Sequence, residues 1–152
     1  MKSTLLISVL VLSLTLTGTA SARSEVCKRT SEKEIAGLFD RWNASLQTGD
    51  PSKVVANYAP RSILLPTISN TPRVTAQAKL DYFVDFLKKK PVGSIDMRMI
   101  QIDCNSAFDA GLYTFKLGDG STVKARYTFT YQWEGGKWLI TSHHSSAMPE
   151  KE

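Results

Sequence analysis

Apolar residues recur at helical spacing in the first half of the chain. Ser31, followed three positions later by Glu34, forms a capping box that predicts a helix start, because each side chain can accept a hydrogen bond from an unpaired backbone N–H. The apolar positions that follow lie on one stripe of that helix: Ile35, Leu38, Phe39, Trp42 and Leu46.

Two more helices are predicted before the middle of the chain. The Gly49-Asp50-Pro51 stretch ends the first helix and starts a short one at Ser52–Asn57. A longer helix is capped by Thr75 and ended by Pro91. The apolar residues expected on one side of the longer helix are Leu80, Phe83, Val84 and Leu87.

From Gly93 onward the pattern changes to strands separated by turn residues. The predicted strands are Ile95–Asp103, Ala107–Leu117, Thr122–Trp133 and Lys137–Ser145, and a short strand, Ser62–Leu65, precedes the third helix. Helices and strands are segregated along the chain, which favours an α+β fold. We expect a cone-shaped fold in which a curved antiparallel sheet wraps around two to three N-terminal helices and leaves an open mouth.

The last two strands form a hairpin that ends in adjacent histidines, His143 and His144. Successive strand residues point to opposite faces, so the two side chains cannot share one role. Alternation places His143 on a face with Leu139, Thr141 and Ser145, and His144 on a face with Trp138, Ile140 and Ser142.

The start of the chain has the pattern of a secretory signal peptide. Lys2 precedes an apolar run at Leu5–Leu16, and Ala20-Ser21-Ala22 fits the cleavage site. We therefore predict a signal peptide at residues 1–22, a single domain at residues 23–152, and a periplasmic or secreted location. Loss of Lys2 changes the formal charge from +5 to +4, and the basic residues are too scattered to indicate a nucleic-acid partner.

The chain has two cysteines, Cys27 and Cys104. Export would place them in an oxidising compartment, so we predict a disulfide that ties the mature N-terminus to a central strand. Two cysteines this far apart do not match a redox motif or a zinc site, and adjacent strand histidines diverge. No metal site or cofactor is therefore predicted.

Four stretches of the chain are distinctive together: Leu46–Asp50, Leu80–Leu87, Gly136–Trp138 and His144–Pro149. In their order and spacing they resemble the nuclear transport factor 2-like cone fold, and within it the association domain of calcium/calmodulin-dependent protein kinase II with its free-standing bacterial relatives. The likeness extends over about residues 31–149. Kinase motifs such as His-Arg-Asp and Asp-Phe-Gly are absent from the sequence. The resemblance therefore implies the fold and an oligomer, and no kinase activity.

The resemblance also implies a pocket between the first helix and the inside of the sheet. The candidate ligand-binding residues are Trp42, Tyr58, Tyr113, Tyr127, Tyr131, His143 and Ser145. Where the kinase association domain has arginines in this pocket, this chain has Phe129 and Ser145, so the same anionic ligand is not implied. Arg126 and His144 are expected at the interface of a homodimer built through the outer sheet face.

A catalytic role is an alternative. Relatives on the cone fold include ketosteroid isomerases and polyketide cyclases, which use an acid/base pair. Here an isomerase, cyclase or dehydratase acting on a small hydrophobic carbonyl compound would use His143 as acid/base and Tyr113 or Tyr127 as hydrogen-bond donor. The acids near predicted elements, none of them clearly in the pocket, are Asp40, Asp96, Asp103 and Asp109.

The leading expectation is an exported, homo-oligomerising domain with a small-molecule-binding cavity and no catalytic role. The two alternatives are the enzyme described above and a purely structural oligomerisation module with a vestigial cavity. No membrane partner is expected after cleavage of the signal peptide.

Overall fold

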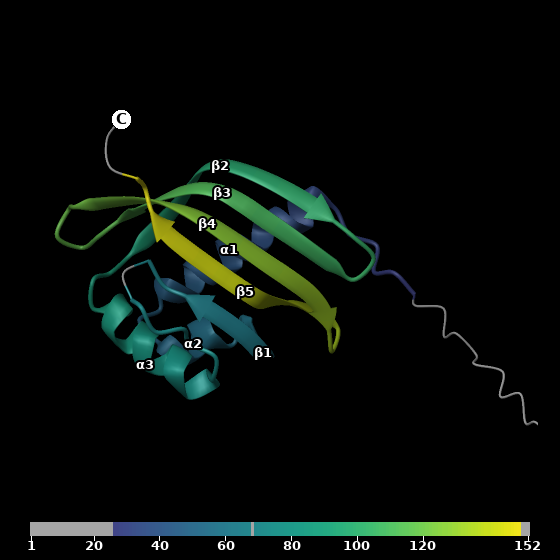
Figure 1. The fold of residues 1–152 in the computed structure, drawn as a ribbon, viewed down its shortest axis with the longest axis horizontal. Coiled ribbons are helices and arrows are strands. Elements are labelled where there is room, and N and C mark those ends of the chain that lie inside the picture. The colour runs from purple at the N-terminus through teal and green to yellow at the C-terminus, as the bar shows by residue number, and fades with distance from the viewer. Residues whose placement is uncertain (1–25, 68, 150–152) are drawn as a thin grey trace, which may run out of the picture.

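The computed structural model describes residues 26–67 and 69–149 (Figure 1). The elements in chain order are α1 (Glu32–Leu46), α2 (Pro51–Val55), β1 (Tyr58–Leu65), α3 (Ala76–Leu87), β2 (Val92–Ile102), β3 (Ser106–Lys116), β4 (Thr122–Glu134) and β5 (Lys137–Ala147). This order confirms the α+β fold with a curved sheet and N-terminal helices. The predicted signal peptide lies outside the described residues.

The sheet has five strands in the order β1-β5-β4-β3-β2. Strands β2 to β5 are antiparallel neighbours, whereas β1 pairs in parallel with β5. The sheet is therefore mixed at one edge, where a wholly antiparallel sheet was predicted. Three other strands lie between β1 and β5 in the sequence, so no hairpin turn joins the two strands and forces them to be antiparallel. Figure 1 shows the sheet curving over α1, with α2 and α3 below its β1 edge.

Helices α1, α2 and α3 each begin at a side-chain cap. The Ser31 hydroxyl accepts a hydrogen bond from the N–H of Glu34, and Asp50 and Thr75 cap α2 and α3 in the same way. The capping box also predicted a hydrogen bond from the backbone N–H of Ser31 to the Glu34 side chain. The Glu34 carboxylate instead accepts a hydrogen bond from the Thr30 hydroxyl at 2.8 Å.

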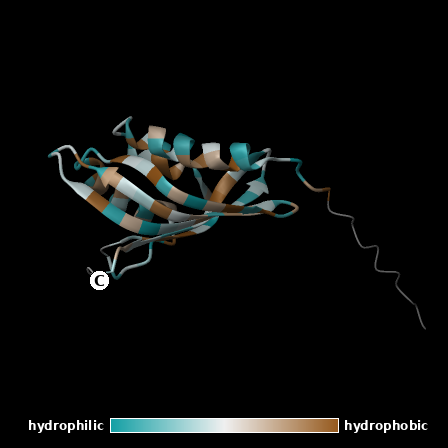
Figure 2. Ribbon diagram, turned by 90° about the horizontal axis from the view of Figure 1, so that it is seen from above, coloured by the Kyte–Doolittle hydropathy of each residue, from teal (hydrophilic) through white to brown (hydrophobic). Residues whose placement is uncertain are grey.

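The core lies between α1, α3 and the inner sheet face. The Trp42 ring lies 5.5 Å from that of Phe129 and 6.4 Å from that of Phe83, so it joins both helices to β4. Hydrophobic and hydrophilic residues alternate along the strands, as Figure 2 shows.

The prediction for the buried side of α3 was wrong at one position. Val84 is 47% exposed, whereas the amphipathic Lys79 is buried. The Lys79 ammonium donates one hydrogen bond to the backbone oxygen of Ser62 at 2.8 Å, which gives it a polar partner there.

A β-bulge changes the faces predicted for β5. Tyr131 pairs with Ile140, but Thr130 pairs with Ser142, so one extra residue stands on β5. The extra residue shifts the alternation, and His143 consequently shares the inner face with Trp138, Ile140 and Ser145. The predicted grouping of His143 with Leu139 and Thr141 was therefore wrong, while its grouping with Ser145 is confirmed.

The predicted disulfide joins Cys27 to Cys104 across 77 positions of sequence. Cys104 lies in the turn between β2 and β3, and not on a central strand, because the pairing of these strands ends at Ile102 and Ala107. The Lys28 backbone N–H donates to the side chain of Asn105 at 2.9 Å, and its ammonium lies 4.4 Å from the Trp133 ring centre. The N-terminal segment is thus held against the end of the sheet.

Candidate functional site

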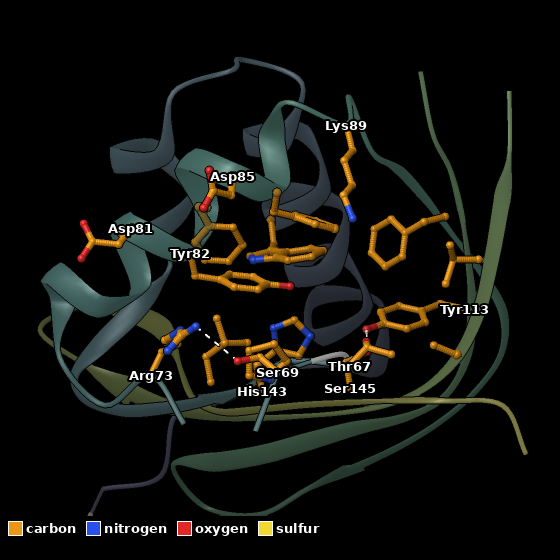
Figure 3. A pocket seen from close by; sticks show the side chains of 18 of the residues that line it. Thr67, Ser69, Arg73, Asp81, Tyr82, Asp85, Lys89, Tyr113, His143 and Ser145 are labelled. Carbon is orange, nitrogen blue, oxygen red and sulfur yellow. Dashed lines mark hydrogen bonds between the residues drawn. The ribbon is translucent and has the colours of Figure 1, made fainter. Parts of the chain in front are cut away.

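A pocket of about 500 Å³ opens between α3, the loop that follows β1, and the inner faces of β3 to β5 (Figure 3). Its walls are mainly aromatic and aliphatic, and include Phe83, Phe86, Phe115 and Leu64. A concave, mostly apolar pocket of this size with a few polar groups is typical of a small-molecule site.

The structure brings four of the seven candidate residues together in the pocket wall: Trp42, Tyr113, His143 and Ser145. The other three are buried nearby but do not line it. Tyr58 lies behind His143, Tyr127 reaches a buried aspartate, and the Tyr131 hydroxyl has no hydrogen-bond partner among the described residues.

His143 is held as a neutral ring. It stacks on Phe129 with ring centres 4.0 Å apart, meets the edge of Trp42 at 5.2 Å, and is 4% exposed. Burial, with a smaller contribution from the charge of His144, lowers the pKa of His143 to about 3. At neutral pH its side chain therefore brings no charge to the pocket.

The tautomer of His143 follows from its partner. The Tyr58 hydroxyl lies 2.9 Å from Nδ1 of His143, and burial raises the pKa of Tyr58 well above 10. Tyr58 thus keeps its proton and donates it to Nδ1, because a hydroxyl that only accepted there would leave its own proton unpaired in the core. The imidazole proton is assigned to Nε2, which is buried and has no partner among the described residues.

A chain of hydroxyl groups joins the sheet to the loop over the pocket. The Tyr113 hydroxyl donates to Oγ of Ser145 at 2.5 Å, and Ser145 is hydrogen-bonded to Thr67 in the loop. Burial raises the pKa of Tyr113, so this hydroxyl also stays protonated. Sequence reasoning missed Thr67, because a polar loop gives no pattern that tells which residue turns inward.

Charged residues gather at the mouth of the pocket. Arg73 of the loop and Lys89, just after α3, line it together with Asp81 and Asp85 (Figure 3). The loop is fixed by two backbone hydrogen bonds between Leu64 and Arg73, at 2.9 and 3.0 Å. None of these four charged residues was a candidate in the sequence, since they come from separate segments that meet only in the fold.

The acids considered for catalysis lie outside the pocket. Asp109 is fully buried, where its carboxylate accepts hydrogen bonds from the Tyr127 hydroxyl at 2.7 Å and from Arg98 at 2.9 Å. Burial raises the pKa of Asp109, against the opposing effects of Tyr127 and Arg98. Asp40, Asp96 and Asp103 are exposed. Asp109 and Arg98 therefore form an internal ion pair under α1.

Arg126 and His144 both lie on the outer sheet face, where they are exposed. The same face carries apolar side chains. Met97 and Met99 of β2 are 53% and 61% exposed, and Leu112 on the neighbouring strand is half-buried.

Residues 26–67 and 69–149 hold no group of three or more histidine, cysteine, aspartate or glutamate side chains placed to bind a metal ion. Within the same residues, every helix is too short or too polar to cross a membrane.

The curved sheet, the helices packed inside it and the pocket at its mouth give this chain the fold of nuclear transport factor 2-like proteins. The model of the family named calcium/calmodulin dependent protein kinase II association domain matches residues 31–149. The chain belongs to this family, as its resemblance predicted.

Solved structures agree with this assignment. A protein from Xanthomonas campestris, described as an association domain of this family, is 52% identical, with a TM-score of 0.77 over 81% of this chain and 91% of that chain. A nuclear transport factor 2-like protein of unknown function from Pseudomonas putida is 21% identical, with a TM-score of 0.69 over 80% of this chain and 89% of that chain. A proposed dehydratase from Streptomyces avermitilis is 9% identical, with a TM-score of 0.68 over 77% and 96% of the two chains, and shares the fold alone. The comparison with curated proteins found no match.

Proposed function

We propose that this chain is an exported, homo-oligomerising domain that binds a small molecule in its cavity without catalysing a reaction on it. The observation that supports binding most strongly is the pocket of about 500 Å³, whose wall includes Trp42, Tyr113, His143 and Ser145. If this region served only as a hydrophobic core, side chains would fill the space, because protein interiors are closely packed.

A catalytic role has less support from the same geometry. An acid/base residue works best when its pKa lies near the working pH, and that of His143 is lowered to about 3 by burial. The buried carboxylate of Asp109 is outside the pocket, engaged with Tyr127 and Arg98. The pocket is therefore better suited to hold a molecule than to transfer a proton.

Binding is tested by native mass spectrometry of the protein purified from its source. We expect one non-covalently bound small molecule per chain, which is lost when the protein is denatured. A native spectrum that shows only the bare chain, from material kept at low temperature and without detergent, would count against the proposal.

The homodimer is proposed to form through the outer sheet face, because Met97 and Met99 of β2 expose apolar area on the face that also carries Arg126 of β4 and His144 of β5. A Met99→Glu variant places a charge on this face and is expected to give monomers in light scattering after gel filtration. Val84→Glu is the matched control, since Val84 is similarly exposed but lies on α3. A Met99→Glu protein that stays dimeric would rule this face out.

Export is proposed from the signal pattern at residues 1–22, and the Cys27–Cys104 disulfide is consistent with an oxidising compartment. Cell fractionation with mass determination of the mature chain tests it. We expect the protein outside the cytoplasm, beginning at Arg23, and recovery of the intact chain in the cytoplasm would contradict this.

A further inference from the structure

Two cations stand at the mouth of the pocket without an ion pair. Arg73 and Lys89 both line the pocket, and neither forms a salt bridge within residues 26–67 and 69–149. Arg73 is half-buried, and one of its terminal nitrogens donates to the Ser69 hydroxyl at 3.2 Å, while its Nε has no partner in the described chain. Figure 3 shows the Lys89 side chain extending from the end of α3 toward the aromatic wall.

The two acids at the same rim do not neutralise these cations. The Asp81 carboxylate accepts a hydrogen bond from Gln77 at 2.8 Å, and Figure 3 shows it pointing away from the pocket interior. Asp85 pairs with Lys88 at 2.7 Å, and its side chain is 79% exposed. The Lys88 ammonium offsets the charge of Asp85, whereas Asp81, bonded to a neutral amide, keeps its charge but points away from the pocket interior. A third acid, Asp119 in the turn after β3, lies close enough to Lys89 for that charge to help lower the pKa of Asp119, but it forms no salt bridge with Lys89 within the described residues. The charge nearest the cavity is therefore positive.

The inner end of the pocket is uncharged. Its wall there is made by the neutral His143, by Ser145 and by aromatic rings such as Trp42, Phe83 and Phe115. A charged group moved to that end would lose its hydrating water, and no opposite charge there would compensate for the lost hydration free energy. An ionised ligand can therefore keep its charge only at the mouth.

Tyr82 adds a donor between these two regions. It lines the pocket, and Figure 3 shows its hydroxyl directed into the space above His143. Burial raises the pKa of Tyr82 to about 12, with the charge of Arg73 opposing the shift, so the hydroxyl is protonated at neutral pH. A protonated hydroxyl beside a guanidinium favours an acceptor oxygen.

We propose that the pocket binds an amphipathic monoanion, a molecule with an apolar ring or short hydrocarbon body and one carboxylate. The body lies against the aromatic wall, and the carboxylate lies at the mouth, where Arg73 and Lys89 supply charge and Tyr82 supplies a hydrogen bond. This inference rests on the proposed function and names its class of ligand.

The test compares three probes of the same shape. Calorimetric titrations use 1-naphthaleneacetate, its neutral isostere 1-naphthaleneacetamide, and the cation 2-(1-naphthyl)ethylamine, with the dialysed full chain purified from expressing cells. The acetate is expected to bind about tenfold more tightly than the amide, because a charge-assisted hydrogen bond is about twice as strong as a neutral one. The amine is expected to bind most weakly, and added salt should weaken only the acetate substantially.

Two variants identify the source of this preference. Lys89→Gln and Arg73→Gln are each expected to lower the ratio of acetate to amide affinity by at least threefold, with little change for the amide. Lys90→Gln is the matched control, because it removes the same charge from the next residue, which does not line the pocket. Lys89 is exposed, so its variant should fold even if Arg73→Gln disturbs the loop.

The outcomes separate the two proposals. If the acetate and the amide bind equally, or the amine binds best, the monoanion is wrong while small-molecule binding stands. If Lys90→Gln lowers the ratio as much as Lys89→Gln, the preference is a general effect of net charge and the assignment to the pocket mouth fails. If none of the three probes binds, the proposed binding function loses its support as well.

Discussion

His143 shows how one residue serves both the core and the candidate site. Its ring stacks on Phe129 and accepts a hydrogen bond from Tyr58, while part of it forms the pocket wall. The side chain is polar, yet its surroundings permit only the neutral form. It therefore links the packing of the sheet to the chemistry of the pocket.

The pH dependence of stability tests this state. The unfolded chain takes up a proton on His143 below its ordinary pKa of 6.5, whereas the folded chain does so only near 3. Stability is therefore full above pH 6.5 and decreases as the pH falls toward 3. Between pH 6.5 and 5 we expect a loss of about 1.5 kcal/mol in the free energy of unfolding.

The measurement is urea unfolding across that range, for the wild type and two variants. His143→Phe keeps an aromatic ring on Phe129 and should remove most of the pH slope. His144→Gln changes the exposed neighbour and should leave the slope as in the wild type. An unchanged slope in His143→Phe would show that His143 is protonated in the folded protein.

Sequence reasoning located some site residues and not others, for a physical reason. Alternation and aromatic content indicated which face Tyr113 and Ser145 occupy, and both line the pocket. Alternation gives the face but not the depth, so it could not distinguish Tyr58 and Tyr131, which lie beside the pocket without lining it. Arg73 could not be found at all, since its place depends on the backbone bridge to Leu64 that closes the loop after β1.

At the scale of elements, the antiparallel strand pairs contain two bulges. One lies on β5 between the residues paired with Thr130 and Tyr131, and the other on β2 between Ile95 and Met97. The pattern of apolar residues predicted the strands but neither bulge, because one extra residue leaves the amino-acid composition of a strand almost unchanged. The bulge on β5 is what places His143 and Ile140 on the same face.

Gly111, which faces Arg98 on the bulged strand β2, is expected to be essential for this pairing. A β-carbon there would overlap the backbone oxygen of Met97, so Gly111→Ala should cost roughly 3 kcal/mol or more of unfolding free energy. Gly37→Ala on α1 is the control, because its added methyl group meets no atom and should stabilise the helix by about 0.5–1 kcal/mol. Thermal and urea unfolding measure both, and a neutral Gly111→Ala would contradict the register.

At the scale of the whole molecule, the helices, the sheet and the disulfide together leave one end of the cone open. The Cys27–Cys104 bond lies at the β2–β3 turn, whereas the pocket lies under α3 and the loop after β1. The pairing of the two cysteines was predicted only from the oxidising compartment that the signal-peptide pattern implies. It could not predict that the bond and the pocket occupy separate regions.

Removal of the disulfide should consequently lower stability without altering the pocket. The entropy of closing a loop of this length predicts a loss of roughly 4.5 kcal/mol as an upper value for the Cys27→Ala/Cys104→Ala variant. Urea unfolding checks the stability, and titration with 1-naphthaleneacetate checks the pocket. A variant that folds but loses probe binding would show that the two regions are coupled.

The most direct test of the account is whether filling the pocket removes the bound molecule. Ala125 is a small, buried residue of the pocket wall, so Ala125→Phe places a ring in the cavity, while Ala76→Phe adds the same ring at an exposed position of α3. Native mass spectrometry of the wild type and the Ala76→Phe protein should show a bound small molecule, and the folded Ala125→Phe protein should show none. A folded Ala125→Phe protein that retains the molecule would place the binding site elsewhere and contradict the account.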